Sequence, residues 1–183
     1  MPRLFVALDL PDEVKKQITN LYYNIDGLRW VKVEQLHLTL RFIGEVTDKQ
    51  EEAIRSSLGA VQAAPFSFQL TGIGQFPGRG KPRVIWVGVT PHTQLTSLHH
   101  QIEARIQSIG YGATDTSFSP HITMARVKFV SDASLALLKQ FFDTHRAFKT
   151  DAIHIDHFTL YSSTLSSEGA SYKAEAIYSL ANT

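Results

Sequence analysis

His37-Leu-Thr-Leu-Arg-Phe-Ile-Gly44 and Ser119-Pro-His-Ile-Thr-Met-Ala-Arg126 are the two stretches of this 183-residue chain that decide its fold. In each, polar and apolar residues alternate, which is typical of a strand with one buried face. Side chains two residues apart on a strand point to the same side, so the histidine and the threonine of each His-x-Thr motif share a face. The apolar residues of the opposite face suit a core beneath helices.

The two motifs belong to a longer repeat with an offset of 84 residues. This offset relates both residues of the motif, and it also takes a helix N-cap expected at Thr47 to one expected at Ser131. The repeat predicts one α+β domain over residues 1–183, built by internal duplication. Its two pseudo-symmetric lobes would each be an antiparallel sheet with helices on the outer face, and together they would form a concave central cleft that both motifs line.

The remaining elements follow from periodicity and from turn residues. Strands are predicted at residues 3–9, 36–43, 66–73, 83–89, 121–127, 151–161 and 171–180. One helical face carries Val14, Ile18, Leu21 and Ile25 and ends at Asp26-Gly27; another carries Leu95, Leu98, Ile102 and Ile109; a last one carries Leu135, Leu138 and Phe142. Residues 74–82, rich in Gly and Pro, read as a loop. Phe42 and Trp86 fall in apolar strand patterns, which predicts core positions.

The bulk composition is that of an ordinary globular domain. The net charge is +1 with a pI near 8.0, which is too mild for a broad nucleic-acid surface, so an anionic substrate would be met by local basic groups. The absence of cysteine excludes disulfides, thiolate metal sites and a cysteine nucleophile. No signal peptide and no apolar run of membrane-spanning length is found. We expect a cytoplasmic monomer that does not associate with membranes.

Two histidines across one cleft suit the opening of a cyclic phosphate. This reaction needs a base that activates water on one side of phosphorus and an acid that protonates the leaving oxygen on the other. Imidazole can do either near neutral pH, and each role contributes roughly 10²–10⁴-fold in rate. We therefore expect His37 and His121 to be catalytic, and Thr39 and Thr123 to donate hydrogen bonds to the phosphate oxygens. The residues alone do not say which histidine is the acid.

The chain resembles the 2H phosphoesterase superfamily, and within it the bacterial and archaeal RNA 2′,3′-cyclic phosphodiesterases, also called 2′-5′ RNA ligases. Besides the two histidine stretches, the similar segments are Arg3-Leu-Phe-Val-Ala-Leu-Asp9, Leu98-His-His-Gln-Ile-Glu103, Ser163-Thr-Leu165 and Gly169-Ala-Ser-Tyr172. The resemblance implies the two-lobed concave fold, no cofactor, and a product that carries a 2′-phosphate. It further implies that His37 protonates the departing 3′ oxygen, that His121 activates water, and that the reverse 2′-5′ joining of RNA ends is possible.

Several basic and aromatic residues are candidates for substrate contacts. The resemblance implies that Arg126 helps to hold the phosphate, yet strict alternation places it on the face opposite His121. A strand bulge would bring it into the cleft; otherwise it forms a structural ion pair. Arg41 shares the His37 face and could reach RNA. In the 74–82 loop, Arg79 and Lys81 could attract RNA phosphates, and Phe76 could stack on a base.

Other functions remain open at this stage. The same histidines could act on a small cyclic phosphate, such as a cyclic nucleotide, or the cleft could bind nucleotide or RNA with little turnover. A metallohydrolase is a further alternative, although the spacing of the other histidines does not suggest zinc ligands, and no metal is expected.

Overall fold

The computed structural model describes residues 2–114, 117–167 and 169–181, and within them the chain forms nine strands and four α-helices. In chain order the elements are β1 Arg3–Asp9, α1 Asp12–Thr19, β2 Leu28–Trp30, the 3-10 helix Val33–Gln35, β3 His37–Glu45, α2 Asp48–Leu58, β4 Phe66–Phe76, β5 Val84–Thr90, α3 Thr93–Ser108, β6 His121–Val127, α4 Asp132–His145, β7 Ile153–Ile155, β8 His157–Ser166 and β9 Gly169–Ser179.

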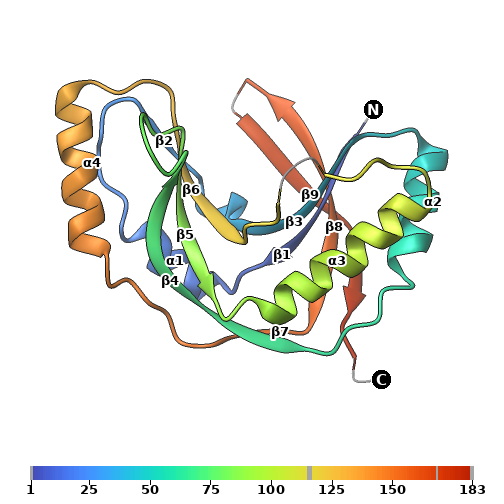
Figure 1. Cartoon of the computed structure of the whole chain (residues 1–183). Coiled ribbons are helices and arrows are strands. Elements are labelled where there is room, and N and C mark those ends of the chain that lie inside the picture. The colour runs from blue at the N-terminus through green and yellow to red at the C-terminus, as the bar shows by residue number, and fades with distance from the viewer. Residues whose placement is uncertain (1, 115–116, 168, 182–183) are drawn as a thin grey trace.

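The strands form a curled, fully antiparallel sheet in the order β7-β4-β5-β6-β3-β1-β8-β9, with β2 added beside β6 (Figure 1). The order is symmetric about its centre, where β3 and β6 meet at the pair Leu38–Ile122. These two residues are related by the 84-residue offset. The predicted α+β fold with two lobes around a concave centre is therefore confirmed, and the sheets of the two lobes join into one through β3 and β6.

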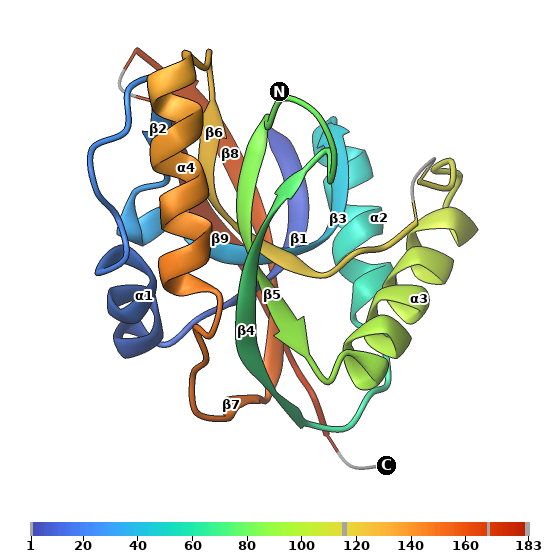
Figure 2. The same ribbon diagram turned by 60° about the vertical axis from the view of Figure 1, so that its left-hand side comes forward.

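The helices cover the outer face of the sheet. Helices α2 and α3 lie together on one side of the molecule, and α1 and α4 lie on the other (Figures 1 and 2). Each buries an apolar stripe, with Ile18, Ile54, Ile102 and Phe141 all at most 1% exposed. The apolar faces of β3 and β6 complete this core, as their alternation predicts.

Both central strands carry a bulge at the same place in the repeat. Along β1–β3 the pairing steps from Val6–Arg41 to Ala7–Thr39 and skips Leu40. Along β5–β6 it steps from Ile85–Ala125 to Trp86–Thr123 and skips Met124, which is Leu40 plus 84. An extra residue reverses the alternation beyond it. The residues directly after each bulge, Arg41 and Phe42 on β3 and Ala125 and Arg126 on β6, therefore face the opposite side from the one that strict alternation predicts.

The helix caps confirm the sequence pattern, whereas some boundaries differ from it. Thr47 forms a full capping box with Gln50, and Ser131 caps α4. Helix α1, however, ends at Thr19, well before the predicted Asp26-Gly27. Beyond the helix, the Tyr22 ring stacks on the Trp30 ring of β2, with 4.3 Å between their centroids. The segment after Thr19 packs through this contact instead of continuing the helix.

Two other expectations were wrong in detail. Strand β4 continues through Gly74 to Phe76, so the predicted loop is only the turn that follows. This close pairing requires glycine, because a Cβ at Gly74 would lie 2.3 Å from the ring of Trp86 on β5. On α4, Leu135 is 37% exposed and Phe141 takes the inward position.

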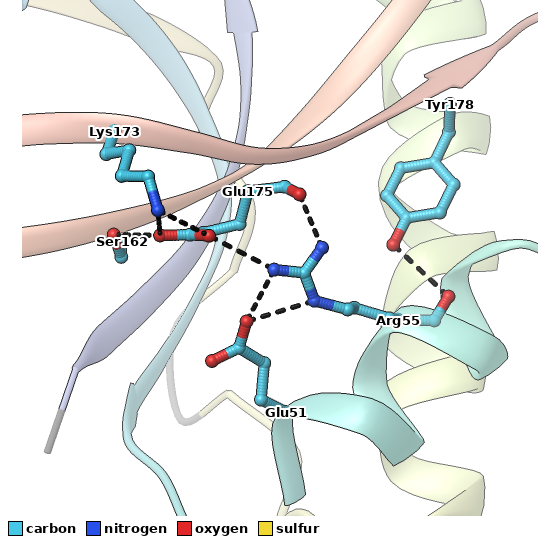
Figure 3. Close-up of polar contacts among 6 residues, drawn as sticks. All are labelled: Glu51, Arg55, Ser162, Lys173, Glu175 and Tyr178. Carbon is cyan, nitrogen blue, oxygen red and sulfur yellow. Dashed lines mark hydrogen bonds and ion pairs between the residues drawn. The ribbon is translucent and has the colours of Figure 1, made fainter. Parts of the chain in front are cut away.

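A polar network fixes α2 to the edge of the sheet (Figure 3). The Arg55 guanidinium bridges Glu51, one turn before it, and Glu175 of β9, with Nη2 at 2.6 Å and 3.1 Å from their carboxylates. Glu175 also accepts from the Ser162 hydroxyl at 2.7 Å and pairs with Lys173. Its side chain is only 15% exposed, so the network satisfies a carboxylate that is largely removed from water.

Candidate active site

The centre of the sheet holds a cavity with a volume of about 540 Å³. Its lining includes His37 and Thr39 from β3 and His121 and Thr123 from β6. This volume lies in the range of small-ligand sites. The structure therefore brings together the four residues that the sequence selects.

The register of β3 and β6 sets how these side chains face one another. Because Leu38 pairs with Ile122 in an antiparallel arrangement, the histidine of each strand lies opposite the threonine of the other. The two histidines are then diagonal neighbours, whose Cβ atoms are usually somewhat less than about 7–8 Å apart. That spacing leaves room for one phosphate between the rings.

Each imidazole is held by a hydrogen bond of the same kind, from Nδ1 to the carbonyl of the residue two positions before it. The Nδ1 of His37 lies 2.7 Å from the Gln35 carbonyl, and the Nδ1 of His121 lies 2.7 Å from the Ser119 carbonyl. A carbonyl oxygen can only accept, so Nδ1 carries the hydrogen in each ring and donates it. The nitrogen left for chemistry is therefore Nε2. In His37 this atom lies 3.0 Å from the Thr39 hydroxyl.

The electrostatic surroundings of the two histidines differ. Burial is the largest influence and lowers the pKa of both rings. The backbone hydrogen bond acts in the opposite direction in each case, and the positive charge of Arg126 lowers the pKa of both. Only His37 is affected by a carboxylate: Asp9, its partner across the β1–β3 pair, raises the His37 pKa, and Lys15 lowers it.

The bulges decide which arginine reaches the cavity. The β6 bulge turns Arg126 into the lining, so the bulge alternative of the sequence analysis is the right one. The β3 bulge turns Arg41 away, which corrects its prediction as an RNA contact. Arg41 is 6% exposed beneath the helices, 3.1 Å from the Glu103 carboxylate and 2.6 Å from the Gly112 carbonyl.

The bulge on β3 also exposes an aromatic ring. Phe42 was expected in the core, yet its side chain is 65% exposed and lines the cavity. It occupies the position on β3 that Arg126 occupies on β6, since the two are 84 residues apart. The same backbone feature thus supplies a cation on one side of the cleft and an aromatic face on the other.

The other predicted contact residues divide into two groups. Phe76 lines the cavity, and its ring lies edge-on to that of His121 at 4.9 Å. Trp86 is half-buried and packs against Phe76 at 5.3 Å. Arg79 and Lys81 lie in the exposed turn after β4 and are not part of the cavity lining. Their contact with RNA stays a prediction.

Part of the lining escapes sequence analysis. Tyr172 of β9 meets the His37 ring edge-on at 5.2 Å, as Phe76 meets His121. Arg29, Gln35 and Leu165 also face the cavity. Leu165 and Tyr172 lie in segments that carry the family resemblance, but no periodicity points them toward the cleft. They arrive there because the β8–β9 hairpin folds beside β1.

Two features of the described residues bear on the alternative functions. No group of three or more His, Cys, Asp or Glu side chains among residues 2–114, 117–167 and 169–181 is placed to hold a metal ion. In the same ranges, none of the helices has both the length and the apolar character needed to span a membrane.

Comparison with known proteins identifies similar sequences and folds. The family model described as LigT like Phosphoesterase matches residues 8–86 and 87–172. An RNA 2′,3′-cyclic phosphodiesterase of Thermotoga maritima is 34% identical, over 93% of this chain and 91% of that protein. One of Archaeoglobus fulgidus is 31% identical, over 93% and 96%. The crystal structure of Escherichia coli LigT in its apo form superimposes with a TM-score of 0.80 at 27% identity, covering 99% of this chain and 98% of that one, and LigT has also been solved with 3′-AMP.

Proposed function

This chain belongs to the LigT-like phosphoesterase family, and we propose that it hydrolyses the 2′,3′-cyclic phosphate ends of RNA to 2′-phosphate ends, without metal, through His37 and His121. The observation that carries the proposal is the pair of imidazoles in one cavity, each with Nδ1 bound to a backbone carbonyl, so that Nε2 is the nitrogen that can transfer a proton. The relatives named for this reaction support it.

The surroundings of the rings favour one assignment of roles. A general acid must hold its proton until the leaving oxygen needs it, and the negative charge of Asp9 helps His37 to do so. His121 has the Arg126 cation among its influences and no carboxylate, which favours the neutral ring that a base requires. The proposed acid is therefore His37 and the proposed base is His121, in agreement with the family resemblance.

The reaction then proceeds by displacement at phosphorus. The Nε2 of His121 takes a proton from water as the water oxygen bonds to phosphorus. The bond from phosphorus to the 3′ oxygen breaks, and the Nε2–H of His37 gives its proton to that oxygen. Thr39 and Thr123 donate hydrogen bonds to the non-bridging oxygens, where negative charge accumulates, and Arg126 balances that charge. Run backwards with a 5′-hydroxyl end in place of water, the same steps would form a 2′-5′ linkage.

A direct assay tests the proposal. An RNA oligonucleotide with a 2′,3′-cyclic phosphate end is incubated in excess chelator, and the position of the product phosphate is determined. We expect a 2′-phosphate product and full activity with chelator. H37A and H121A should each reduce kcat/KM by about 10²–10⁴-fold with unchanged circular dichroism. Near-normal turnover in either variant would contradict the assigned roles, and tight nucleotide binding with no turnover in the wild type would favour a binding module.

A further inference from the structure

Two arginines face each other on the floor of the cleft. Strands β2 and β6 pair in the register Arg29–Arg126, so the two side chains emerge from adjacent positions on the same side of the sheet. Both line the central cavity and both are exposed. The short strand β2 therefore adds a second cation beside the one that the bulge supplies.

This arrangement is unfavourable without an anion. Like charges directly opposite in a sheet destabilise it. Among the described residues, no ion pair joins either guanidinium to a carboxylate. By contrast, the buried Arg41 and the half-buried Arg55 each have a carboxylate partner. Arg29 and Arg126 thus face the cavity without a carboxylate partner among the described residues.

The two arginines act on different parts of the cavity. The charge of Arg126 acts on His37, His121 and Tyr172, whereas that of Arg29 is not among the influences on any of them. Arg29 extends toward the β8–β9 hairpin, where a Cβ built on Gly169 would lie 3.0 Å from its Nη2. The Arg29 guanidinium is thus directed to the side of the cleft formed by the β8–β9 hairpin, whereas Arg126 acts on both imidazoles.

We propose that Arg29 forms a second phosphate subsite, which binds the phosphodiester one nucleotide before the cyclic end. This inference rests on the proposed function and specifies its substrate: an RNA chain that places two phosphates in the cleft, rather than a cyclic mononucleotide with one.

Paired substrates provide the test. Arg29→Ala should lower kcat/KM about ten-fold for a dinucleotide ending in a 2′,3′-cyclic phosphate, the size of one charge-assisted hydrogen bond. Turnover of 2′,3′-cyclic AMP should stay within about two-fold, because it has no second phosphate. The slope of log(kcat/KM) against log salt should become shallower by about 0.7 for the dinucleotide, as expected for one lost contact to single-stranded RNA. Arg146→Ala, which removes an arginine outside the cavity, should change neither substrate.

The Tm of the variant and the pattern of loss on the two substrates separate the competing explanations. Arg29→Ala should not lower Tm, because it relieves repulsion; a fall in Tm would mean that Arg29 holds the hairpin instead. Equal losses on both substrates would place Arg29 on the reacting phosphate, and no loss on either would remove the subsite, so each result overturns the proposal.

Binding of the 2′-phosphate-ended dinucleotide and of 2′-AMP, measured by calorimetry, needs no turnover. It therefore tests the subsite even if the wild type opens neither substrate. If Arg29→Ala binds the dinucleotide more weakly than the wild type but binds 2′-AMP equally well, the subsite is supported. If the variant and the wild type bind the dinucleotide equally, the subsite is refuted.

Discussion

Removing the charge of Asp9 tests the assignment of His37 as the acid. Asp9 lies opposite His37 in the β1–β3 register and forms an ion pair at 2.8 Å with Lys15, which is 8% exposed. Asp9→Asn removes the charge that raises the His37 pKa and leaves the cation of Lys15, which lowers it. Both effects favour the neutral ring, so the acid form should be lost at lower pH than in the wild type.

The size of the effect follows from the sheet geometry. Residues directly opposite have Cβ atoms about 4.5–5.5 Å apart, which puts carboxylate and imidazole roughly 7 Å from each other. Two charges at about 7 Å interact by about 0.6 kcal/mol at the dielectric constant of water and about 2.4 kcal/mol at an effective value of 20. Asp9 is half-exposed and already paired, so the lower figure applies. It corresponds to a factor of about three in the protonated fraction.

The assay combines kinetics with NMR titration of the ring protons. On the alkaline side of the pH–rate profile, kcat/KM of Asp9→Asn should be about three-fold lower. The His37 pKa should fall, and that of His121 should not move. If His37 were the base instead, a lower pKa would leave the alkaline rate unchanged.

A double variant provides the control. Asp9→Asn/Lys15→Met removes both charges, whose effects on His37 oppose each other. The double variant should therefore recover most of the alkaline rate. A rate that stays as low as in the single variant would show that the loss has another cause, such as a disturbed fold.

Three further predictions concern the buried pair, the edge network and the exposed ring. Arg41→Met removes the charged partner of the buried Glu103 carboxylate. It should lower the free energy of unfolding in urea by about 3–5 kcal/mol and leave kcat/KM of the folded variant unchanged. A selective loss of RNA turnover would show instead that Arg41 contacts RNA. The Glu175 pKa is lowered first by the Ser162 hydrogen bond, so this carboxylate stabilises the fold above its unfolded pKa, and the gain is lost as pH falls through the lower native pKa. Glu175→Gln should thus be about 1–3 kcal/mol less stable than wild type at pH 7 and equal to it near pH 2; a pH-independent difference would contradict the linkage. Phe42→Ala should weaken nucleotide binding by about 1–3 kcal/mol if a base stacks on this ring. The Tm should not change, because the ring is 65% exposed. A large fall in Tm would show that Phe42 packs in the core.

The sequence predicts those parts of the fold that depend on local patterns. Alternation within each histidine stretch predicts a strand whose histidine and threonine face the cleft. The helix caps at Thr47 and Ser131 are predicted from the residues next to them. The repeat relates the two motifs, from which the shared cleft follows. These features need no knowledge of distant contacts, which is why they could be predicted.

The errors arise where long-range packing overrides the pattern. The bulges bury Arg41 and expose Phe42, and Arg41 can be buried because Glu103, 62 residues later, neutralises it. Likewise, helix α1 stops early because Tyr22 stacks on Trp30 from another element. Tyr172 and Arg29 reach the cavity only through the pairing of β8–β9 and of β2–β6. The three-residue β2 is too short to leave a pattern, and the residues do not show that the β8–β9 hairpin lies beside β1.

The carbonyl anchors on the two imidazoles affect how the site recovers between turnovers. In the proposed mechanism, one turnover leaves a proton on the ring that began without it and removes one from the other. A ring that flipped to exchange its nitrogens would give up its bond to the Gln35 or Ser119 carbonyl. The proposed mechanism therefore requires that protons exchange with water at Nε2 while both rings stay in place.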